Sequence, residues 1–192
     1  NVVDIQKWAD IAHEAGVPLI VDNTVATPLL CRAFDHGADI VVHSLTKYIG
    51  GHGTTIGGAI VDSGKFDWAA HPERFSVMTT PDPSYHGVVY TEGFGEAAYI
   101  GRCRVVPLRN TGAALSPHSA FMIMQGLETL SLRMKKHCKN AKKVAKYLQQ
   151  HPQVKWVNYA GLKDSPYRET CEKICGGKAA GIVSFGIEGG IE

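Results

Sequence analysis

The sequence has little of what marks a secreted disulfide scaffold, a metal protein or a membrane span. Five cysteines occur in 192 residues, and no two form a Cys-x-x-Cys pair. Nine histidines occur without a His-Glu-x-x-His arrangement, so we expect no metal site. No run of 18 apolar residues is present, which predicts no membrane partner. A sparse, odd set of cysteines is typical of reduced intracellular thiols and predicts a cytoplasmic protein.

An excess of charge of either sign is also missing. Lys and Arg number 20 against 18 Asp and Glu, a net charge of +2, which argues against a nucleic-acid or membrane surface as the partner. The densest basic run, residues 133–146, is interleaved with apolar residues, and we interpret it as a solvated helix face. With 44% apolar residues the chain can bury one large domain or somewhat more.

Two short apolar runs, residues 19–21 and 40–42, are typical of strands covered on both faces. Between them, residues 28–36 predict a helix that ends at Gly37 in a left-handed cap. A strand, helix and strand over this length predict parallel strands joined by a right-handed crossover. Parallel strands share one carboxyl edge, and ligands of open α/β sheets bind at that edge.

The residues at this predicted edge suggest a specific chemistry. Asp22 follows the first strand, and Ser44-Leu45-Thr46-Lys47-Tyr48 follows the second. A partly desolvated lysine amine is a nucleophile toward carbonyls, and a carboxylate can keep a pyridine nitrogen protonated. With two hydroxyls for a phosphate, the set suits pyridoxal 5′-phosphate (PLP). The alternatives are a turn or cap role for Asp22, or an Asp22–Lys47 salt bridge, which leaves the hydroxyls unassigned.

The rest of the chain adds layers around this unit. Asp4 can cap a helix with apolar positions from Ile5 to Ala15, and residues 56–61 resemble a further strand. Glycines 50, 51 and 53 lack the spacing of a nucleotide-binding phosphate loop, so we assign them to close backbone approach or to a turn. Residues 66–95 are aromatic and broken by proline, which predicts a loop with either a functional or a packing role.

A long helix is predicted after Ser116, which can act as its cap, with Pro117 at the first position. Its apolar positions continue to Leu148, and His151-Pro152 ends it. Residues 154–157 and 182–187 then resemble strands of a second, smaller unit. A sheet made only of the strands seen here has too few neighbours to cover its faces, so we expect a fragment of a longer polypeptide.

At this point the residues resemble a known family. Val21-Asp22-Asn23-Thr24, the stretch from Asp39 to Gly53 and Leu115-Ser116-Pro117 are together similar to the Cys/Met-metabolism PLP enzymes, over essentially the whole chain. Residues 81–95 and 126–134 are most similar to the O-acetylhomoserine sulfhydrylase branch. The resemblance implies an α/β type I (aspartate-aminotransferase-like) fold with a mostly parallel sheet between helices. It also implies the large PLP-binding domain over 1–133 and the start of a small α+β domain over 134–192.

Carried onto matching positions, the resemblance implies that Lys47 is the Schiff-base lysine and the catalytic base. Asp22 becomes the partner of the pyridinium, Ser44 and Thr46 become phosphate ligands, and Thr24 lies under the ring. The family's other phosphate turn, its ring-stacking tyrosine, the tyrosine and arginine from a neighbouring subunit and its carboxylate-binding arginine have no counterpart in these residues.

The resemblance implies PLP-dependent γ-replacement on O-acetylhomoserine with sulfide or a thiol, giving homocysteine, in a homotetramer. The partners are then a small amino-acid substrate and sulfide or a thiol, with no nucleic acid and no membrane. Cystathionine γ-synthase or a methionine or cystathionine γ-lyase is the alternative within the family. A catalytically silent α/β scaffold is an alternative of another class, against which the intact Asp22, Ser44, Thr46 and Lys47 argue.

Overall fold

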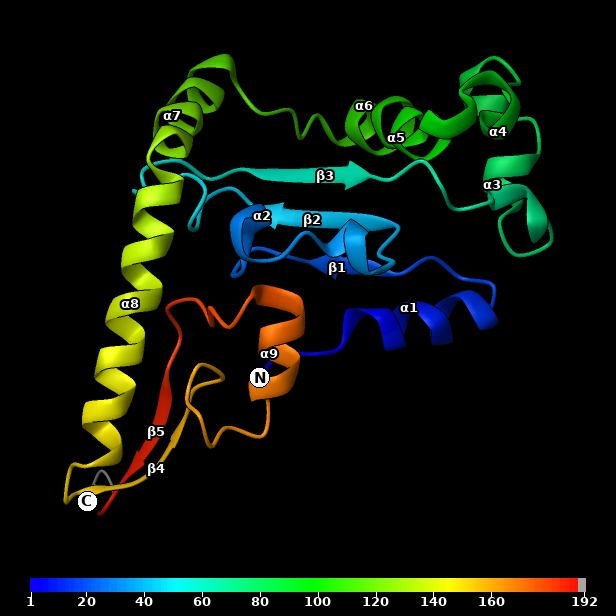
Figure 1. The fold of residues 1–192 in the computed structure, drawn as a ribbon. Helices are drawn as coiled ribbons and strands as arrows, with labels where there is room; N and C mark the ends of the chain where they lie inside the picture. Colours follow the sequence, from blue (N-terminus) through cyan, green and yellow to red (C-terminus); the bar gives the residue numbers. More distant parts are fainter. Residues whose placement is uncertain (190–192) are drawn as a thin grey trace.

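The structure, a computed structural model, describes residues 1–189 (Figure 1). Its main sheet has the order β1-β2-β3. Strands β1 (Ile20–Asp22) and β2 (Ile40–Ser44) run parallel, with Asp22 beside Val42. Strand β3 (Gly58–Asp62) adds antiparallel to the other side of β2. The predicted parallel pair is therefore confirmed, and the third strand brings the chain back across the sheet.

The middle strand carries the buried part of this sheet. Ile40 and Val41 of β2 are almost fully buried, whereas Ile20 of β1 is 51% exposed. The prediction that residues 19–21 are covered on both faces is therefore wrong for the described part of the chain. The reason is position: β1 is an edge strand of this sheet, and the surrounding helices cover it only in part.

The helix predicted over residues 28–36 is two short helices. These are α2 (Thr27–Leu30) and the 3-10 helix η1 (Ala33–His36), separated by Cys31 in an extended conformation. The Asn23 side-chain amide donates a hydrogen bond to the Cys31 carbonyl at 2.8 Å, so this carbonyl faces the end of β1 instead of a helical N–H. Gly37 adopts a φ of 88°, which confirms the predicted left-handed cap.

Helix α1 (Ile5–Glu14) forms where the apolar spacing predicts it. Asp4 stands at the cap position but makes no side-chain bond to the helix. Its carboxylate pairs instead with Lys173 of α9 (Arg168–Cys175) at 3.0 Å, and this hydrogen bond lowers the pKa of Asp4. Ile5 and Ile174 share a core cluster, so the last described helix packs against the first.

The aromatic segment after β3 is a cluster of short helices, and the prediction of a loop over residues 66–95 is wrong. Phe66, Trp68 and Phe75 meet edge to face, and Tyr99 stacks on Trp68 at 5.5 Å between ring centroids. These contacts support the packing interpretation of the segment. Its elements are η2 (Trp68–Ala70), α3 (Ser76–Thr79), η3 (Pro83–Tyr85), α4 (Tyr90–Gly93), η4 (Gly95–Ala97), α5 (Ala98–Cys103), the π-helix η5 (Arg104–Leu108) and α6 (Arg109–Thr111).

The single long helix predicted after Ser116 is broken into α7 (Pro117–Glu128) and α8 (Leu130–Gln149). Ser116 caps α7 as predicted, since its hydroxyl accepts the Ser119 N–H at 3.1 Å. The two helices run along one side of the sheet, and an antiparallel pair of strands, β4 (Val154–Asn158) and β5 (Ser184–Ile187), lies at the far end (Figure 1). In residues 1–189, no helix has both the length and the apolar content needed to cross a bilayer.

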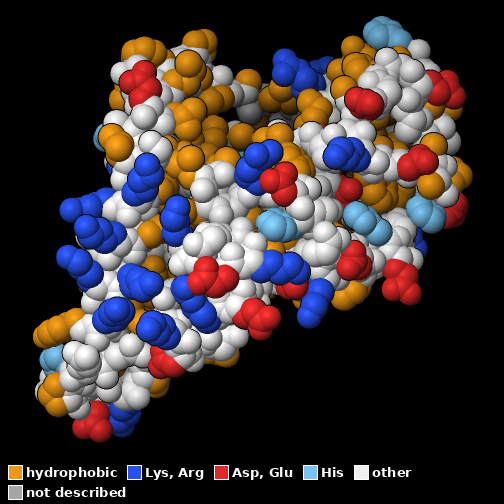
Figure 2. Space-filling model, viewed as in Figure 1, with side chains coloured by type: hydrophobic (Ala, Val, Ile, Leu, Met, Phe, Trp, Pro, Cys, Tyr) orange, Lys and Arg blue, Asp and Glu red, His pale blue; other side chains and the backbone are white. Residues whose placement is uncertain are grey.

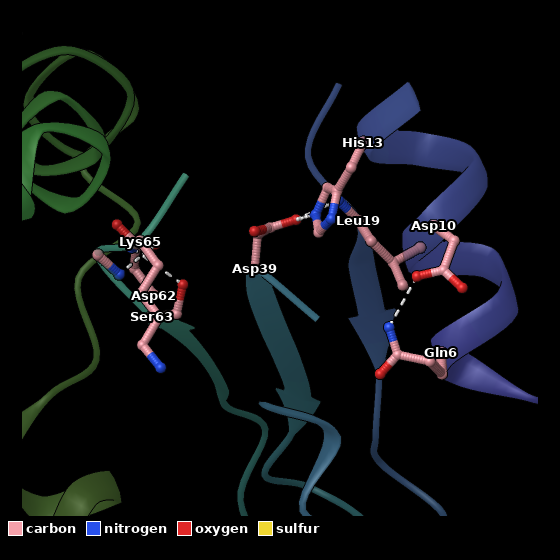
Figure 3. Close-up of polar contacts among 9 residues, drawn as sticks. Gln6, Asp10, His13, Leu19, Asp39, Asp62, Ser63 and Lys65 are labelled. Atoms are coloured by element: carbon pink, nitrogen blue, oxygen red, sulfur yellow. Dashed lines mark hydrogen bonds and ion pairs between the residues drawn. The ribbon is translucent and has the colours of Figure 1, made fainter. Parts of the chain in front are cut away.

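A polar network lies at the edge of the sheet where β2 begins (Figure 3). Asp39 is buried, and its Oδ2 accepts the Leu19 N–H and contacts Nε2 of His13, both at 2.7 Å. Asp62 is the last residue of the neighbouring strand β3, and its Oδ2 is buried with no hydrogen-bond partner in the described part of the chain. The other oxygen of Asp62 accepts the Gly64 N–H at 3.1 Å, so this edge contains one carboxylate oxygen that has no partner among the described residues.

Replacing Asp62 with asparagine is expected to stabilise the fold at neutral pH. Burial raises the pKa of Asp62, so the folded protein binds this proton more tightly than the unfolded chain does. The stabilisation from that proton is present at acid pH and is lost as the pH rises through the raised pKa. Thermal unfolding of Asp62→Asn should therefore show a higher Tm at pH 7 and little change near pH 3. An equal shift at both pH values would contradict this account.

Candidate active site

The residues predicted to carry the chemistry lie at the other edge of the sheet, where β1 and β2 both end. Asp22 is the last residue of β1, and Ser44 is the last of β2. The Thr24 hydroxyl accepts the Ser44 N–H at 2.7 Å, while the Thr24 N–H donates to Asp22 Oδ1 at 3.0 Å. Thr24 therefore connects the two strand ends.

Asp22 is held in its anionic form. Its side chain is exposed, and hydrogen bonds from the Thr24 hydroxyl and then from the Thr24 N–H lower its pKa. The Asp22 carboxylate therefore adds to the free energy of unfolding at neutral pH. This stabilisation is lost as the pH falls through the lowered pKa. A fixed carboxylate at a sheet edge can accept a hydrogen bond from a protonated ring nitrogen.

Replacing Thr24 with valine should weaken this junction. The change leaves the Ser44 N–H without its acceptor, and we expect a loss of about 1–2 kcal/mol in the free energy of unfolding at pH 7. Thr24→Ser is the matched control, since it keeps the hydroxyl. Urea unfolding of both variants provides the measurement. Equal stabilities of Thr24→Val and the wild type would exclude the bridging role.

The turn that carries Lys47 is fixed through its backbone. The Lys47 N–H donates to the Ser44 carbonyl at 3.2 Å, and the Gly51 N–H donates to the Lys47 carbonyl at 2.8 Å. A further bond joins the Gly50 N–H to the Leu45 carbonyl at 2.8 Å. The Lys47 side chain itself is exposed, so residues 1–189 do not supply the desolvation expected of it.

The two hydroxyls expected at the phosphate differ in their surroundings. Within the described residues, the Ser44 hydroxyl makes no hydrogen bond to another protein group. Thr46 Oγ1 accepts the Gly57 N–H at 3.0 Å and also contacts the Gly57 carbonyl at 3.4 Å. Ser44 can therefore donate to a phosphate oxygen as it stands, whereas Thr46 must redirect its hydroxyl hydrogen.

A cavity of about 490 Å³ opens beside β1. Asp22 and Asn23 contribute polar groups to a wall that is otherwise mostly apolar, with Val21 and Ile174 among its residues. Lys47 does not line this cavity. The structure thus brings Asp22, Ser44 and Lys47 to one sheet edge, but it places Asp22 alone of these three at the cavity wall.

The basic run of residues 133–146 lies on α8, and its members differ in what they contact. Lysines 135, 136, 139, 142, 143 and 146 are exposed on α8, as the solvated-face interpretation predicts, and basic side chains gather along this helix in Figure 2. Arg133 differs, because its guanidinium reaches the turn after Lys47. Gly126, inside an otherwise good helix, was the available signal, since an interior helix glycine often marks a close backbone contact.

The profile of the family described as "Cys/Met metabolism PLP-dependent enzyme" matches residues 1–192. The chain belongs to this family. It is 52% identical to a homocysteine synthase of Schizosaccharomyces pombe over 99% of this chain and 44% of that protein. It is 48% identical to an O-acetyl-L-homoserine sulfhydrylase of Leptospira meyeri over 100% of this chain and 45% of that protein. The Cys/Met-metabolism chain thus spans less than half the length of these curated relatives.

A solved structure supports the same fold for this Cys/Met-metabolism chain. A Campylobacter jejuni protein described as an O-acetylhomoserine (thiol)-lyase matches it with a TM-score of 0.90 and 40% identity, covering 98% of this chain and 47% of that one. That crystal structure contains N′-pyridoxyl-lysine-5′-monophosphate. The predicted family and α/β type I fold are confirmed. The roles of Lys47, Asp22, Ser44 and Thr46 stay predictions.

Proposed function

We propose that this chain is part of an O-acetylhomoserine sulfhydrylase, which replaces the acetate of O-acetylhomoserine with sulfide or a thiol. The observation that carries the proposal is the shared sheet edge, where Asp22 ends β1 and the Ser44–Lys47 turn follows β2. The names of the relatives, a homocysteine synthase and an O-acetyl-L-homoserine sulfhydrylase, support the product and the substrate.

The donor set fits PLP. Asp22 offers an anionic carboxylate for the ring nitrogen, because its hydrogen bonds with Thr24 keep its pKa low. Ser44 offers a hydroxyl without a protein partner in the described residues, and Thr46 stands two residues away in the same turn. The exposed Lys47 amine is accessible to an aldehyde carbon. These residues would contact the ring nitrogen, the phosphate and the aldehyde carbon.

Each residue then has a distinct task. When bound, the cofactor supplies an electron sink for the bond broken at the substrate α-carbon. Lys47 holds the aldehyde until the substrate amine replaces it, and its freed amine then takes the α-proton. Asp22 keeps the ring nitrogen protonated, an electrostatic contribution worth about 3 kcal/mol or more. Ser44 and Thr46 hold the phosphate so that Lys47 stays close to the α-carbon.

The net reaction is a balanced exchange at the γ-carbon. The carbon–oxygen bond to acetate breaks, acetate leaves with its electron pair, and the sulfur of hydrogen sulfide forms the new bond. Protons removed at the α- and β-carbons return to the same carbons, and we assign this transfer to Lys47. The second proton of hydrogen sulfide is released, so the products are homocysteine, acetate and a proton, with no change of oxidation state overall.

The test is a product assay on the full-length protein. With O-acetylhomoserine and sulfide we expect homocysteine, and with cystathionine or methionine we expect little 2-oxobutyrate. Dominant 2-oxobutyrate would favour a γ-lyase, and cystathionine formed from cysteine would favour a γ-synthase. A protein that stays colourless with added PLP would favour the silent scaffold.

We also propose a homotetramer in the cytoplasm, with the large domain over 1–133 and the small domain from 134. The unpaired state of all five cysteines agrees with a reducing compartment. The proposed domain boundary corresponds to a position within α8, close to where α7 and α8 meet at Thr129. Residues 190–192 lie outside the described part of the chain. Analytical ultracentrifugation tests the tetramer.

A further inference from the structure

Arg133, near the start of α8, joins the lysine turn to the junction between α7 and α8. Its Nη1 donates to the Tyr48 carbonyl at 2.6 Å, and its Nη2 donates to the Ile49 carbonyl at 3.2 Å. Nη2 also reaches the Gly126 carbonyl at 2.7 Å, and Nε donates to Thr129 Oγ1 at 3.0 Å. Tyr48 directly follows Lys47, so the guanidinium binds the backbone from which the reactive amine extends.

In the described residues, the Arg133 guanidinium donates all of its hydrogen bonds within this contact. Among the ion pairs of the described residues, none involves Arg133. Its partners are three backbone carbonyls and one hydroxyl, all within hydrogen-bond distance. A planar guanidinium can direct several N–H donors at fixed angles, which a lysine ammonium cannot do from one position. The geometry therefore requires arginine specifically.

The glycines around Arg133 make room for the contact. A Cβ on Gly126 would overlap the Gly50 carbonyl, so α7 touches the backbone of the turn directly. A Cβ on Gly51 would overlap the Arg133 guanidinium, and Gly51 also has a φ of 75°. The absence of a side chain at Gly126 and at Gly51 thus allows the turn, the guanidinium and the helix junction to lie in contact.

Apolar side chains also pack the same turn against α7 and α8. Ile49 is 7% exposed and lies in a core cluster with Ile123 of α7 and Met134 of α8. The Tyr48 ring packs beside His137 of α8 at 5.2 Å between ring centroids. Leu45 and Tyr48 also pack against this cluster. The lysine turn therefore contacts the α7–α8 pair through hydrogen bonds and through apolar side chains.

We propose that Arg133 is a positioning residue, which fixes the Lys47 turn against the α7–α8 junction and so sets where the Lys47 amine lies. The role in turnover rests on the proposed function. A displacement of a reacting group by about 1 Å can cost on the order of 100-fold in rate. A loosened turn should therefore reduce kcat more than it changes substrate binding.

The experiment compares Arg133→Lys with Arg32→Lys in the full-length protein. Arg32 is a matched control, because its side chain is 75% exposed and, among residues 1–189, forms an ion pair with Asp35 alone. We expect Arg133→Lys to lower kcat about tenfold or more with KM within about twofold of wild type. The pH at which the absorbance of bound PLP changes should also shift. Arg32→Lys should match the wild type in all three.

A second measurement does not depend on the cofactor. Hydrogen exchange of the Gly50 and Gly51 amides, which donate to Leu45 and Lys47, should be faster in Arg133→Lys than in Arg32→Lys. Wild-type protein that binds no PLP would overturn the proposed function, while this exchange result would still test the contact. If Arg133→Lys does not fold, Thr129→Val removes the Nε acceptor and the Thr129 hydroxyl bond to Gly126 but keeps the three carbonyl contacts of Arg133, and it should show a smaller change of the same kind. A lower Tm with unchanged kcat, PLP absorbance and exchange would overturn the proposal.

Discussion

Alanine at position 47 should abolish turnover and leave no pyridoxyl group on the protein after borohydride reduction. Lys47 is the reactive amine that the proposed function places beside both hydroxyls and Asp22 at the sheet edge. Loss of a positioned acid–base group alone costs about 100- to 10,000-fold, and loss of the covalent attachment adds to it. Mass spectrometry of the reduced full-length protein would locate the adduct, and a homocysteine assay would measure the rate.

Lys65→Ala is the matched control for this change. Lys65 is an exposed lysine that lies beyond β3, at the edge where β2 begins, so its loss should affect neither adduct nor rate (Figure 3). A wild-type rate in Lys47→Ala, or an adduct that remains in this variant, would mean that another amine holds the cofactor. The assignment of Lys47 would then fail, although the family membership would stand.

Loss of the Asp22 carboxylate should have the second largest effect. Asp22→Ala removes the anion proposed to keep the ring nitrogen protonated, and we expect kcat to fall about 100- to 1,000-fold. The pyridoxyl adduct on Lys47 should persist, because Asp22 is not proposed to bind the aldehyde. The two measurements together separate a loss of chemistry from a loss of cofactor attachment.

The control for this variant is Asp35→Ala, which removes an exposed carboxylate that is 54% accessible and pairs with Arg32 on the surface. It should retain the wild-type rate. An unchanged rate in Asp22→Ala would contradict the role of ring partner. A loss of the adduct at saturating PLP would assign Asp22 to cofactor retention instead.

The edge that holds the candidate site could be predicted from sequence because its signals are local. Short apolar runs set β1 and β2, and the left-handed Gly37 ends the connection between them. Parallel pairing then brings Asp22 and Ser44 to the same edge without any knowledge of the tertiary packing.

The departures from prediction arise from tertiary contacts. The connection breaks at Cys31, whose carbonyl binds the Asn23 side chain. The helix after Ser116 breaks at Thr129, where the Arg133 guanidinium binds the hydroxyl of Thr129 and the carbonyl of Gly126. Apolar periodicity continues across both breaks, so a sequence pattern cannot detect them. The bridging role of Thr24 and the contact of Arg133 with the lysine turn were not predicted either, because the partners are backbone groups of distant segments.

The polar groups expected to limit the stability of the fold and the residues proposed for catalysis lie at opposite ends of the sheet. Its two ends hold different polar groups: the unsatisfied Asp62 oxygen and the Asp39–His13 contact at one, and Asp22 and the lysine turn at the other. A protein engineer could therefore improve heat resistance by redesigning the first end, with little of the usual penalty in activity. Homologous enzymes from hot and temperate habitats should accordingly differ more at the first end than at the second.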